Sequence, residues 1–532
     1  MDVDYIVVGA GSAGCPLANQ LSRDANSSVL LIEAGPGDNN ALIKMPKGFG
    51  KLQGNPKYAW HFPQKPFPPM HQQETWARGK VLGGSSAING MIYNRGNQAD
   101  FDHLAELGLP AWSWDNVVAA YREIEDNELG ATPTRGSGGP LHVSHLRGAD
   151  PICAEIIAAG GSLGWKPVDD YNETDDERIG YAMCTIKNGQ RVSAARAFIH
   201  PIQDRPNLTV ETGSVAVRLL RDGDRITGVR VRRGGVEVEH RARREVILSL
   251  GSVATPKLLQ LSGIGPADVL RDAGVDVVVD SPGIGANMRE HRCLAFHYRL
   301  NENVGYNKLL STMPRQALST LRYYFTHKGP MATPAYDVVG FVKTRPDAER
   351  PDAQLLTSPW SLTTANLKQP RLEREPGLQC IGYVLRPESE GRIAITSADP
   401  DAELEIVPNY FGADYDREVA IGLFRTIRRL FATEPIASFI SHETQPGSTV
   451  GDDGEEMINA ALTSGYCGYH SVGTVAMGRA QDAPLDPELR VRGVDGLRVV
   501  DTSVVPTMVA GNCNAPMMAF GWMAGKLIRG ET

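Results

Sequence analysis

Residues 4–34 combine two short apolar runs with one amphipathic stretch, and this pattern predicts a strand, a helix and a second strand. The runs at 4–8 and 29–34 are almost wholly aliphatic, as buried parallel strands are. Between them, Leu17, Ala18 and Leu21 share one face of a helix predicted over residues 12–23. The three elements form a β–α–β unit of about thirty residues, which predicts a parallel sheet.

Apolar runs later in the chain predict more elements around this sheet. Strands are expected at residues 207–217, 226–231, 245–250 and 497–500, and helices at 117–124 and 516–528. Residues 35–78 are rich in proline, glycine and aromatic side chains and show little periodicity. We expect them to form an ordered, packed excursion.

Between about residues 293 and 460 the pattern changes to short alternating strands separated by charged, proline-rich loops. Strands at 338–343, 378–385 and 391–396, with a helix at 415–430, predict an antiparallel sheet with helices. We therefore expect a second domain there, and a fold class that combines α/β with α+β.

Composition and charge exclude some classes of partner but do not identify the function. The chain has 532 residues, of which 42% are hydrophobic and 22% charged, as in an ordinary globular protein of two domains. Its net charge of -8 argues against nucleic acid and anionic membrane surfaces as partners.

The seven cysteines are odd in number and lack metal-site spacing, which favours buried thiols in a reducing compartment. Since there is no long apolar run and no leader before the first strand, we expect no membrane span and a cytoplasmic location.

The first chemical motif is the glycine triplet Gly9, Gly11 and Gly14, between the first strand and the first helix. Glycines there let backbone amides at a helix N-terminus approach a pyrophosphate. Glu33 ends the second strand nineteen residues after Gly14, where a carboxylate can accept hydrogen bonds from ribose hydroxyls. The motif predicts dinucleotide binding and disfavours NADP, but it does not separate FAD from NAD.

Three further motifs follow, far apart in the chain. The second is GKVLGGSSAIN at residues 79–89, and the third is GSVATPKLLQLSGIG at 251–265, another predicted strand-to-helix turn. The fourth is a pair of polar side chains, His470 and Asn512. A neutral histidine can accept a hydroxyl proton near pH 7, and a second hydrogen-bonding side chain can hold the alcohol oxygen.

In order and spacing, these motifs resemble the glucose–methanol–choline (GMC) oxidoreductase family over nearly the whole chain. Residues 79–102 are similar to its first signature and residues 251–265 to its second. The resemblance implies a discontinuous Rossmann-like FAD-binding domain (1–150, 191–292 and 461–532) and a substrate domain with an antiparallel sheet (151–190 and 293–460). It also implies oxidation of an alcohol to an aldehyde or ketone, with hydride passing to flavin N5, His470 as the base and Asn512 positioning the hydroxyl.

The resemblance also implies how FAD is held. Some relatives attach FAD covalently through a histidine beside the equivalent of Asn89, where this chain has Ile88, so non-covalent FAD is expected. Asp501 is expected to accept from the ribityl or pyrophosphate region rather than to act as an ordinary cap, and His291 to pack near the cofactor. The implied cofactor-binding residues are Gly9, Gly11, Ser12, Ala13, Gly14, Glu33, Ala34, Val81, Gly83, Gly84, Ser85, Asn89, Gly90, Met91, Ile92, Val215, Tyr469, Asp501, Cys513 and Asn514.

The residues leave the alcohol and the electron acceptor open. Tyr469 is expected to line the substrate pocket, and Tyr336 with Asp337 would suit a quaternary ammonium such as choline. Aliphatic, sugar, glycol and benzylic alcohols are alternatives. Gly468 lacks a side chain near the expected flavin face, which would admit oxygen or a larger substrate, so the acceptor is either oxygen or a quinone-type molecule. The main rival is a non-redox lyase of the same family that keeps FAD structurally, and a flavin-bearing electron-transfer protein is a third reading.

Overall fold

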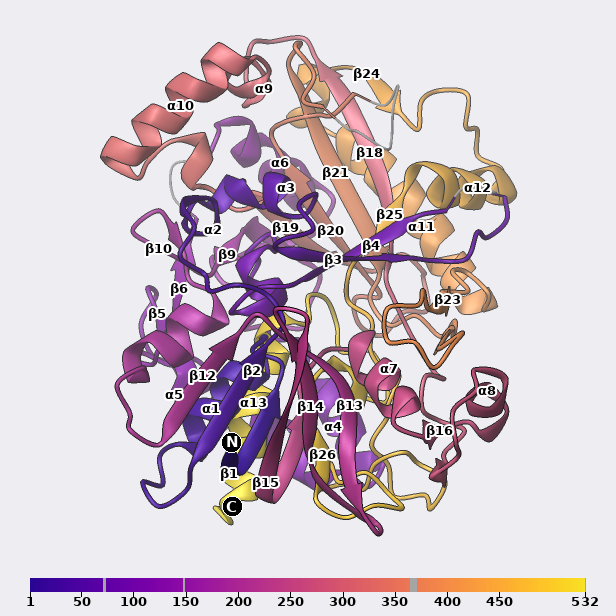
Figure 1. Cartoon of the computed structure of the whole chain (residues 1–532). Coiled ribbons are helices and arrows are strands. Elements are labelled where there is room, and N and C mark those ends of the chain that lie inside the picture. Colours follow the sequence, from indigo (N-terminus) through magenta and orange to yellow (C-terminus); the bar gives the residue numbers. More distant parts are fainter. Residues whose placement is uncertain (70–72, 147–148, 364–370, 532) are drawn as a thin grey trace.

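Two large sheets form the framework of the molecule and lie one above the other in Figure 1. The computed structural model describes residues 1–531 apart from 70–72, 147–148 and 364–370. Within this part of the chain the lower sheet has seven strands and the upper sheet eight. Both sheets combine parallel with antiparallel pairs. Both chain ends lie at the foot of the lower sheet.

The lower sheet has a parallel core that is built from separated stretches of the chain. β1 (Asp2–Val8) lies between β2 (Val29–Glu33) and β15 (Val236–Leu248), and both pairs are parallel. β12 (Leu208–Thr212) extends the core beside β2, and β26 (Leu497–Val499) joins β15 from the other end of the sequence. The predicted parallel sheet is therefore confirmed.

One predicted strand of this sheet is two strands. The run at 207–217 divides at Gly213, whose φ of 74° turns the chain. β12 before it pairs with β2, whereas β13 (Ser214–Asp222) after it pairs antiparallel with β14 (Arg225–Arg233). β15 also begins earlier than predicted, because most of residues 236–244 are polar or charged and exposed, so the strand extends beyond the apolar run at 245–250.

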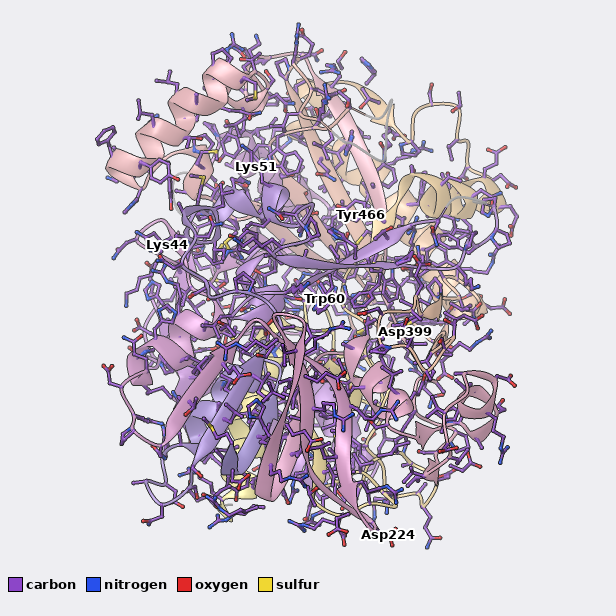
Figure 2. All side chains as sticks on the ribbon, in the orientation of Figure 1. Lys44, Lys51, Trp60, Asp224, Asp399 and Tyr466 are labelled. Carbon is purple, nitrogen blue, oxygen red and sulfur yellow. The ribbon has the colours of Figure 1, made fainter. Side chains whose placement is uncertain are left out.

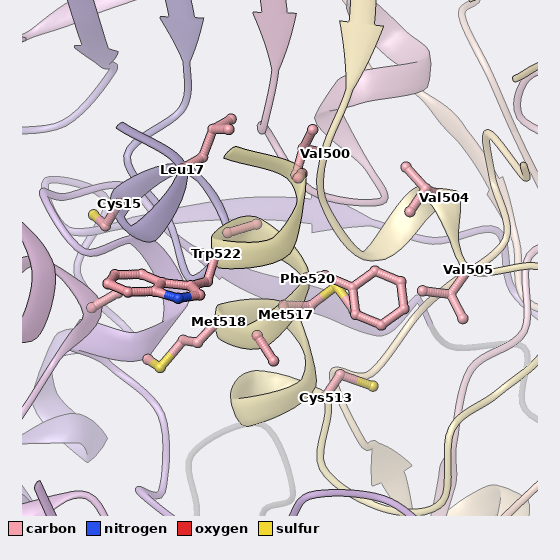
Figure 3. Close-up of a cluster of buried hydrophobic side chains, with 14 of the residues drawn as sticks. Cys15, Leu17, Val500, Val504, Val505, Cys513, Met517, Met518, Phe520 and Trp522 are labelled. Atoms are coloured by element: carbon pink, nitrogen blue, oxygen red, sulfur yellow. The ribbon is translucent and has the colours of Figure 1, made fainter. Parts of the chain in front are cut away.

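Two helices cover the parallel core, one from each end of the chain. α1 (Gly14–Leu21) follows β1, and α13 (Asn514–Ile528) packs against it. The approach is close, because a Cβ added at Gly521 would lie 2.2 Å from the Ala13 carbonyl oxygen. Figure 3 shows side chains of α13, among them Met517, Phe520 and Trp522, in this buried cluster.

The upper sheet is mainly antiparallel, which confirms the prediction for the second half of the chain. Its strands are β24 (Ile440–Gln445), β18 (Arg292–Leu300), β21 (Gly377–Val384), β20 (Ala353–Ser358), β19 (Val338–Val342), β8 (Arg178–Tyr181) and β7 (Lys166–Pro167), with β25 (Tyr466–Cys467) beside β18.

Alternating burial was expected in these strands, but every residue of β19, β20 and β21 is buried. Helices α6 (Ile152–Ser162) and α11 (Asp414–Phe431) pack on strands of this sheet, while other side chains of β20 and β21 line an internal cavity. The run at 391–396 is a further correction. It forms β22 (Arg392–Ala394), which pairs with β23 (Glu405–Val407) outside the upper sheet.

Shorter elements complete the described structure. They are α2 (Ala41–Lys44), α3 (Phe49–Leu52), β3 (Ala59–Pro63), β4 (Thr75–Gly79), α4 (Gln98–Glu106), α5 (Trp114–Ile124), β5 (Glu125–Asn127), β6 (Leu141–His145), β9 (Met183–Cys184), β10 (Ile186–Lys187), β11 (Gln190–Arg191), α7 (Ala254–Leu261), β16 (Ile264–Gly265), α8 (Ala267–Asp272), β17 (Val279–Asp280), α9 (Asn307–Leu310), α10 (Met313–Thr326) and α12 (Gly454–Ser464). The domain boundaries given above stay a prediction.

Two expectations from composition can be compared with the described residues. All seven cysteines are buried and free. No described helix has both the length and the apolar character needed to cross a membrane. The same residues contain no cluster of histidine, cysteine or acidic side chains that would hold a metal ion.

Candidate active site

One cavity of about 2490 Å³ is lined by residues of both sheets. Its floor includes the carboxyl ends of parallel strands, at Val8, Ile32 and Ser249. Trp60 and Tyr466 also line it, and both lie near the centre of the molecule in Figure 2. In open parallel sheets, the carboxyl ends of the strands are where ligands bind.

The glycine triplet shapes one end of this cavity. A Cβ at Gly14 would lie 1.9 Å from the Gly9 carbonyl oxygen, and a Cβ at Gly9 would lie 2.3 Å from the Ser249 carbonyl oxygen. A Cβ at Gly11 would meet no protein atom within 4 Å, although Gly11 lines the cavity. Gly14 and Gly9 therefore permit the turn itself, whereas Gly11 leaves room for a ligand at the start of α1.

The second motif folds directly onto the first. The Gly83 amide donates to the Ala10 carbonyl at 2.8 Å, and a Cβ at Gly84 would lie 2.7 Å from the Gly11 Cα. Met91 holds a φ of 63° at the cavity, in the left-handed region that non-glycine residues rarely adopt. Such backbone strain is typical of ligand-binding segments.

Glu33 lies at the same end with acceptor capacity to spare. Its two carboxylate oxygens accept from the amides of Gly35 and Ala10, at 2.9 and 3.2 Å. One lone pair on each oxygen is left, and burial raises the pKa of this carboxyl to about 7. Donors such as ribose hydroxyls would therefore complete its hydrogen bonding.

The surroundings of Asp501 differ from the expectation that it accepts hydrogen bonds from the cofactor. Its carboxylate accepts from the Gly251 amide (2.9 Å), the Thr255 hydroxyl (2.6 Å), and the amide and hydroxyl of Ser503 (2.8 and 2.6 Å). These four bonds use all of its lone pairs. Although Asp501 borders the cavity, it fixes the loop before α7 as a cap and has no acceptor left for a cofactor.

The start of α13 brings the fourth motif to the first. The Ser12 hydroxyl donates to Asn514 Oδ1 at 2.7 Å, although 502 residues separate the two. Most of the predicted cofactor-binding residues line the cavity. Those that do are Gly9, Gly11, Ser12, Ala13, Glu33, Ala34, Gly84, Ser85, Asn89, Gly90, Met91, Ile92, Val215, Tyr469, Asp501, Cys513 and Asn514. Gly14, Val81 and Gly83 lie behind the lining, where Gly14 and Gly83 support the turns.

His470 and Asn512 meet at the other end of the cavity. Asn512 Nδ2 lies 3.1 Å from His470 Nε2, and both residues line the cavity. Asn512 Oδ1 is buried and has no hydrogen-bond partner among the described residues. Sequence reasoning therefore paired two side chains that the fold places in contact.

A chain of three groups fixes which nitrogen of His470 carries a proton. The Leu385 carbonyl, which can only accept, lies 3.1 Å from His291 Nε2, so this nitrogen donates. A neutral His291 then has a bare Nδ1, which lies 2.9 Å from His470 Nδ1. His470 must donate there, and its Nε2 is left unprotonated and directed at the cavity. Sequence reasoning missed this role of His291, because it depends on a contact between residues 179 positions apart.

The same surroundings keep both rings neutral. Burial lowers the pKa of His291 to about 4. Burial also holds the pKa of His470 well below its usual value, and the neighbouring His291 and Arg78 add to the effect. A histidine with such a pKa is available as a base throughout the neutral range.

Glu290 and Arg78, which the sequence did not single out, hold the segment that carries His470. Glu290 Oε1 accepts from the His470 amide at 2.6 Å, and Glu290 Oε2 pairs with the Arg78 guanidinium at 3.1 Å. Arg78 also donates to the Ser471 hydroxyl at 2.8 Å. Tyr469 has a left-handed φ of 64° and is 38% exposed to the cavity. An ion pair between the buried Glu290 and the largely buried Arg78 thus maintains a strained turn beside the histidine.

Gly468 allows close packing of the two histidine side chains. A Cβ at this position would lie 2.7 Å from the His291 Cβ and 3.3 Å from His470 Nδ1. The missing side chain therefore makes room for the two histidine rings, which is a different reason from the space for oxygen or substrate expected above.

Strands of the upper sheet form the roof over His470. Cys293, Ala295 and His297 alternate along β18 toward the cavity, as do Gln379, Ile381 and Tyr383 along β21. The Tyr336 and Tyr466 hydroxyls lie 2.8 Å apart on the same surface. Burial lowers the pKa of His297 to about 4, so the side chains of this roof are uncharged at pH 7.

Asp337 does not join Tyr336 at the cavity. Its Oδ2 accepts from the Tyr306 hydroxyl at 3.0 Å, and it is fully buried and does not line the cavity. Both residues precede β19, and of the two only Tyr336 lines the cavity. The expected pair is thus reduced to Tyr336.

Comparison with known proteins identifies the family of this chain. Two sequence profiles, each described as GMC oxidoreductase, match residues 3–293 and 387–521. The chain belongs to the GMC oxidoreductase family. It is 36% identical over 536 residues to an alcohol dehydrogenase [acceptor] of Pseudomonas putida, covering 99% of this chain and 95% of the relative. It is also 36% identical over 538 residues to an oxygen-dependent choline dehydrogenase of Rhizobium etli (strain CIAT 652), covering 100% and 96%.

Solved structures of flavoenzymes share the fold of this GMC oxidoreductase. Pyridoxine 4-oxidase from "Mesorbium loti" superposes with a TM-score of 0.89 at 28% identity, and 100% of each chain is covered. A variant of the formate oxidase of Aspergillus oryzae RIB40 gives 0.91 at 28% identity, with 99% and 98% covered.

The expected enzyme class is confirmed. The chain is an FAD-dependent oxidoreductase of the GMC family that acts on the CH–OH group of an alcohol, and the comparisons do not support the non-redox lyase. The residues present fit FAD, because the space open at Gly11, the spare acceptors of Glu33 and the start of α13 border one continuous cavity.

Proposed function

We propose that His470 is the catalytic base of this enzyme and that Asn512 positions the alcohol. The unprotonated Nε2 of His470, 3.1 Å from the Asn512 amide at the cavity, is the observation that carries this proposal. An alcohol oxygen that replaces this direct contact donates its hydroxyl proton to Nε2 and accepts a hydrogen bond from Nδ2. FAD, when bound, supplies the hydride acceptor.

The glycine turn, Glu33 and the residue 83–92 segment are the proposed cofactor site, and Tyr336 and Tyr469 are the proposed substrate contacts. We propose that FAD is held non-covalently, because residue 88 is an isoleucine without a nucleophilic atom. The segments around the site form the proposed Rossmann-like domain, and the seven free, buried cysteines favour a cytoplasmic location.

A neutral alcohol with an apolar or aromatic part suits the roof better than choline does. Among the described lining residues, Glu74 pairs with Arg292 and Asp401 pairs with Arg232. Glu33 lies at the far end beside the glycine turn, and Asp501 is saturated by its own loop. No described carboxylate is therefore left on the roof to offset a quaternary ammonium, which such a ligand needs beside its aromatic contacts.

Anaerobic mixing of the yellow holoenzyme with alcohols, followed by air, tests the proposal. Aliphatic and benzylic alcohols should bleach the flavin band at about 450 nm faster than choline does. His470→Ala should keep its FAD but bleach about 10²–10⁴-fold more slowly. His240→Ala removes a buried histidine that does not line the cavity, and it should bleach at the wild-type rate.

Each outcome decides one point. Wild-type bleaching rates in His470→Ala would remove this residue from the role of base. Fast bleaching by choline alone would overturn the neutral-substrate assignment. Rapid recovery in air would identify oxygen as the acceptor, and slow recovery would indicate a quinone-type acceptor.

A further inference from the structure

Helix α10 turns its apolar side chains outward. Twelve large hydrophobic side chains are exposed in the described structure, and six of them lie in α9 and α10. These six are Leu309, Met313, Leu318, Leu321, Tyr324 and Phe325. They are between 50% and 82% exposed. Tyr323 is the only buried residue of α10. Most large apolar side chains of the helix therefore do not serve the core.

The exposed residues form one face. At about 100° per residue, positions 313, 317, 318, 321, 324 and 325 fall within an arc of about 140°. Arg315 and Arg322 lie directly beside this arc, and Tyr323 lies on the opposite side. An ordinary surface helix directs its apolar arc inward, so this arrangement is reversed.

The charge of this segment opposes that of the whole chain. Residues 307–328 contain Lys308, Arg315, Arg322 and Lys328 but no aspartate or glutamate, whereas the chain carries a net charge of -8. None of the four cations forms an ion pair with any residue that the structure describes. An apolar arc with two arginines along one edge and a lysine beyond each end of the helix suits a helix that lies in a membrane interface.

The apolar face also continues into the active-site cavity. Met313, Ala317, Leu321 and Tyr324 belong to the cavity lining, so α10 forms part of its rim. The helix stands at the upper outer edge of the molecule in Figure 1, and its side chains project from that edge in Figure 2. A partner that covers the apolar arc would therefore lie directly beside an entrance to the cavity.

We propose that α9 and α10 dock this enzyme on the surface of an anionic phospholipid bilayer, with α10 lying in the interface. The 14 residues of α10 are too few to cross a bilayer, which needs about 20. Anionic headgroups complement the four unpaired cations. A symmetric contact with a second copy would instead bring the cations of both copies together. The net charge of the whole chain argued against anionic membranes as partners. That average does not show that residues 307–328 are locally basic.

Flotation of the FAD-loaded enzyme with lipid vesicles tests the proposal. The enzyme should float with vesicles of phosphatidylcholine and phosphatidylglycerol, and much less with phosphatidylcholine alone. Raising the salt from about 0.1 M to about 0.5 M should weaken the binding. Leu318→Glu and Phe325→Glu should each reduce it about tenfold or more. Neither residue lines the cavity, so both variants should keep their FAD and their bleaching rate with a water-soluble alcohol.

Val236→Glu is the matched control, because Val236 is 65% exposed on β15 of the lower sheet. It should float like the wild-type enzyme. The proposal is overturned if the wild-type enzyme does not float, or if Leu318→Glu and Phe325→Glu float as well as Val236→Glu. A dimer in solution that Phe325→Glu dissociates, without vesicle binding by the wild-type enzyme, would assign the face to a second copy instead.

Discussion

The groups behind the ring of His470, the proposed base, keep its Nε2 unprotonated. The Leu385 carbonyl orients His291, and His291 accepts from His470 Nδ1, which leaves Nε2 unprotonated at the cavity, beside the Asn512 amide. Burial and the two neighbours hold the pKa of His470 below 6.5. A base must be unprotonated to act, so activity is lost as the pH falls through the pKa of this group. A lowered pKa moves that loss to more acidic pH.

The pH dependence of kcat/KM should therefore stay level from neutral pH to below 6.5. In His291→Ala the pKa of His470 should rise, because the space left by the ring admits water and relieves the burial that is the main cause of the lowering, and the acid limb should move to higher pH. Turnover should also fall by about tenfold, since Nδ1 loses its acceptor.

His291→Gln is the matched variant, because its amide can accept from His470 and donate to Leu385. It should recover part of the turnover. An acid limb in the same place for the wild-type enzyme and His291→Ala would contradict the positioning role of His291.

At the scale of elements, the turn between β1 and α1 assigns different tasks to its glycines. Gly14 is required by the protein itself, since its Cβ would meet the Gly9 carbonyl oxygen at 1.9 Å. Gly11 is free of protein contacts at that position and borders the cavity. The spacing of the glycines in the sequence does not distinguish the two roles. Only the packing around each glycine shows which one the fold needs and which one leaves room for a ligand.

Gly14→Ala should lower the free energy of unfolding of the FAD-free protein by about 1–3 kcal/mol or more, through overpacking. Gly11→Ala should leave that free energy within about 0.5 kcal/mol of wild type. It should still weaken FAD binding at least about tenfold, because the added methyl group occupies the ligand's space. Urea unfolding of the apoproteins and FAD titration measure the two effects. Equal losses of stability in both variants would contradict the division.

At the scale of the whole molecule, the cavity joins parts of the chain that are distant in sequence. Its lining includes Gly11 near the N-terminus, Ser252 shortly after β15, and Asn512 near the C-terminus. A ligand bound there contacts surfaces that exist together only in the folded state. It therefore stabilises the folded protein by mass action.

Removal of FAD should lower the midpoint of thermal unfolding, and adding it back should raise the midpoint with concentration. The gain in unfolding free energy should reach about 2.7 kcal/mol when free FAD is roughly 100 times its Kd. Differential scanning calorimetry over a series of FAD concentrations measures this. A midpoint that does not change with FAD would show that the cofactor does not bridge these segments.

Much of this enzyme could be predicted from its sequence because the signals are local. The β–α–β unit, the glycine triplet, Glu33 and the His470–Asn512 pair depend on residue types and spacings along short stretches of chain. Residue patterns also predicted the two kinds of sheet. Family resemblance then supplied the cofactor and the reaction.

The tertiary structure decided what depends on residues far apart in sequence. Hydrogen-bond saturation by Thr255 and Ser503 makes Asp501 a cap, and the contact with Leu385 makes His291 a positioning group. Which strand residues face the cavity was also decided by packing on both sides of the upper sheet. The outward apolar arc of α10 is the clearest case, because a hydrophobic period predicts a helix face but only the surrounding fold determines whether that face is buried or exposed.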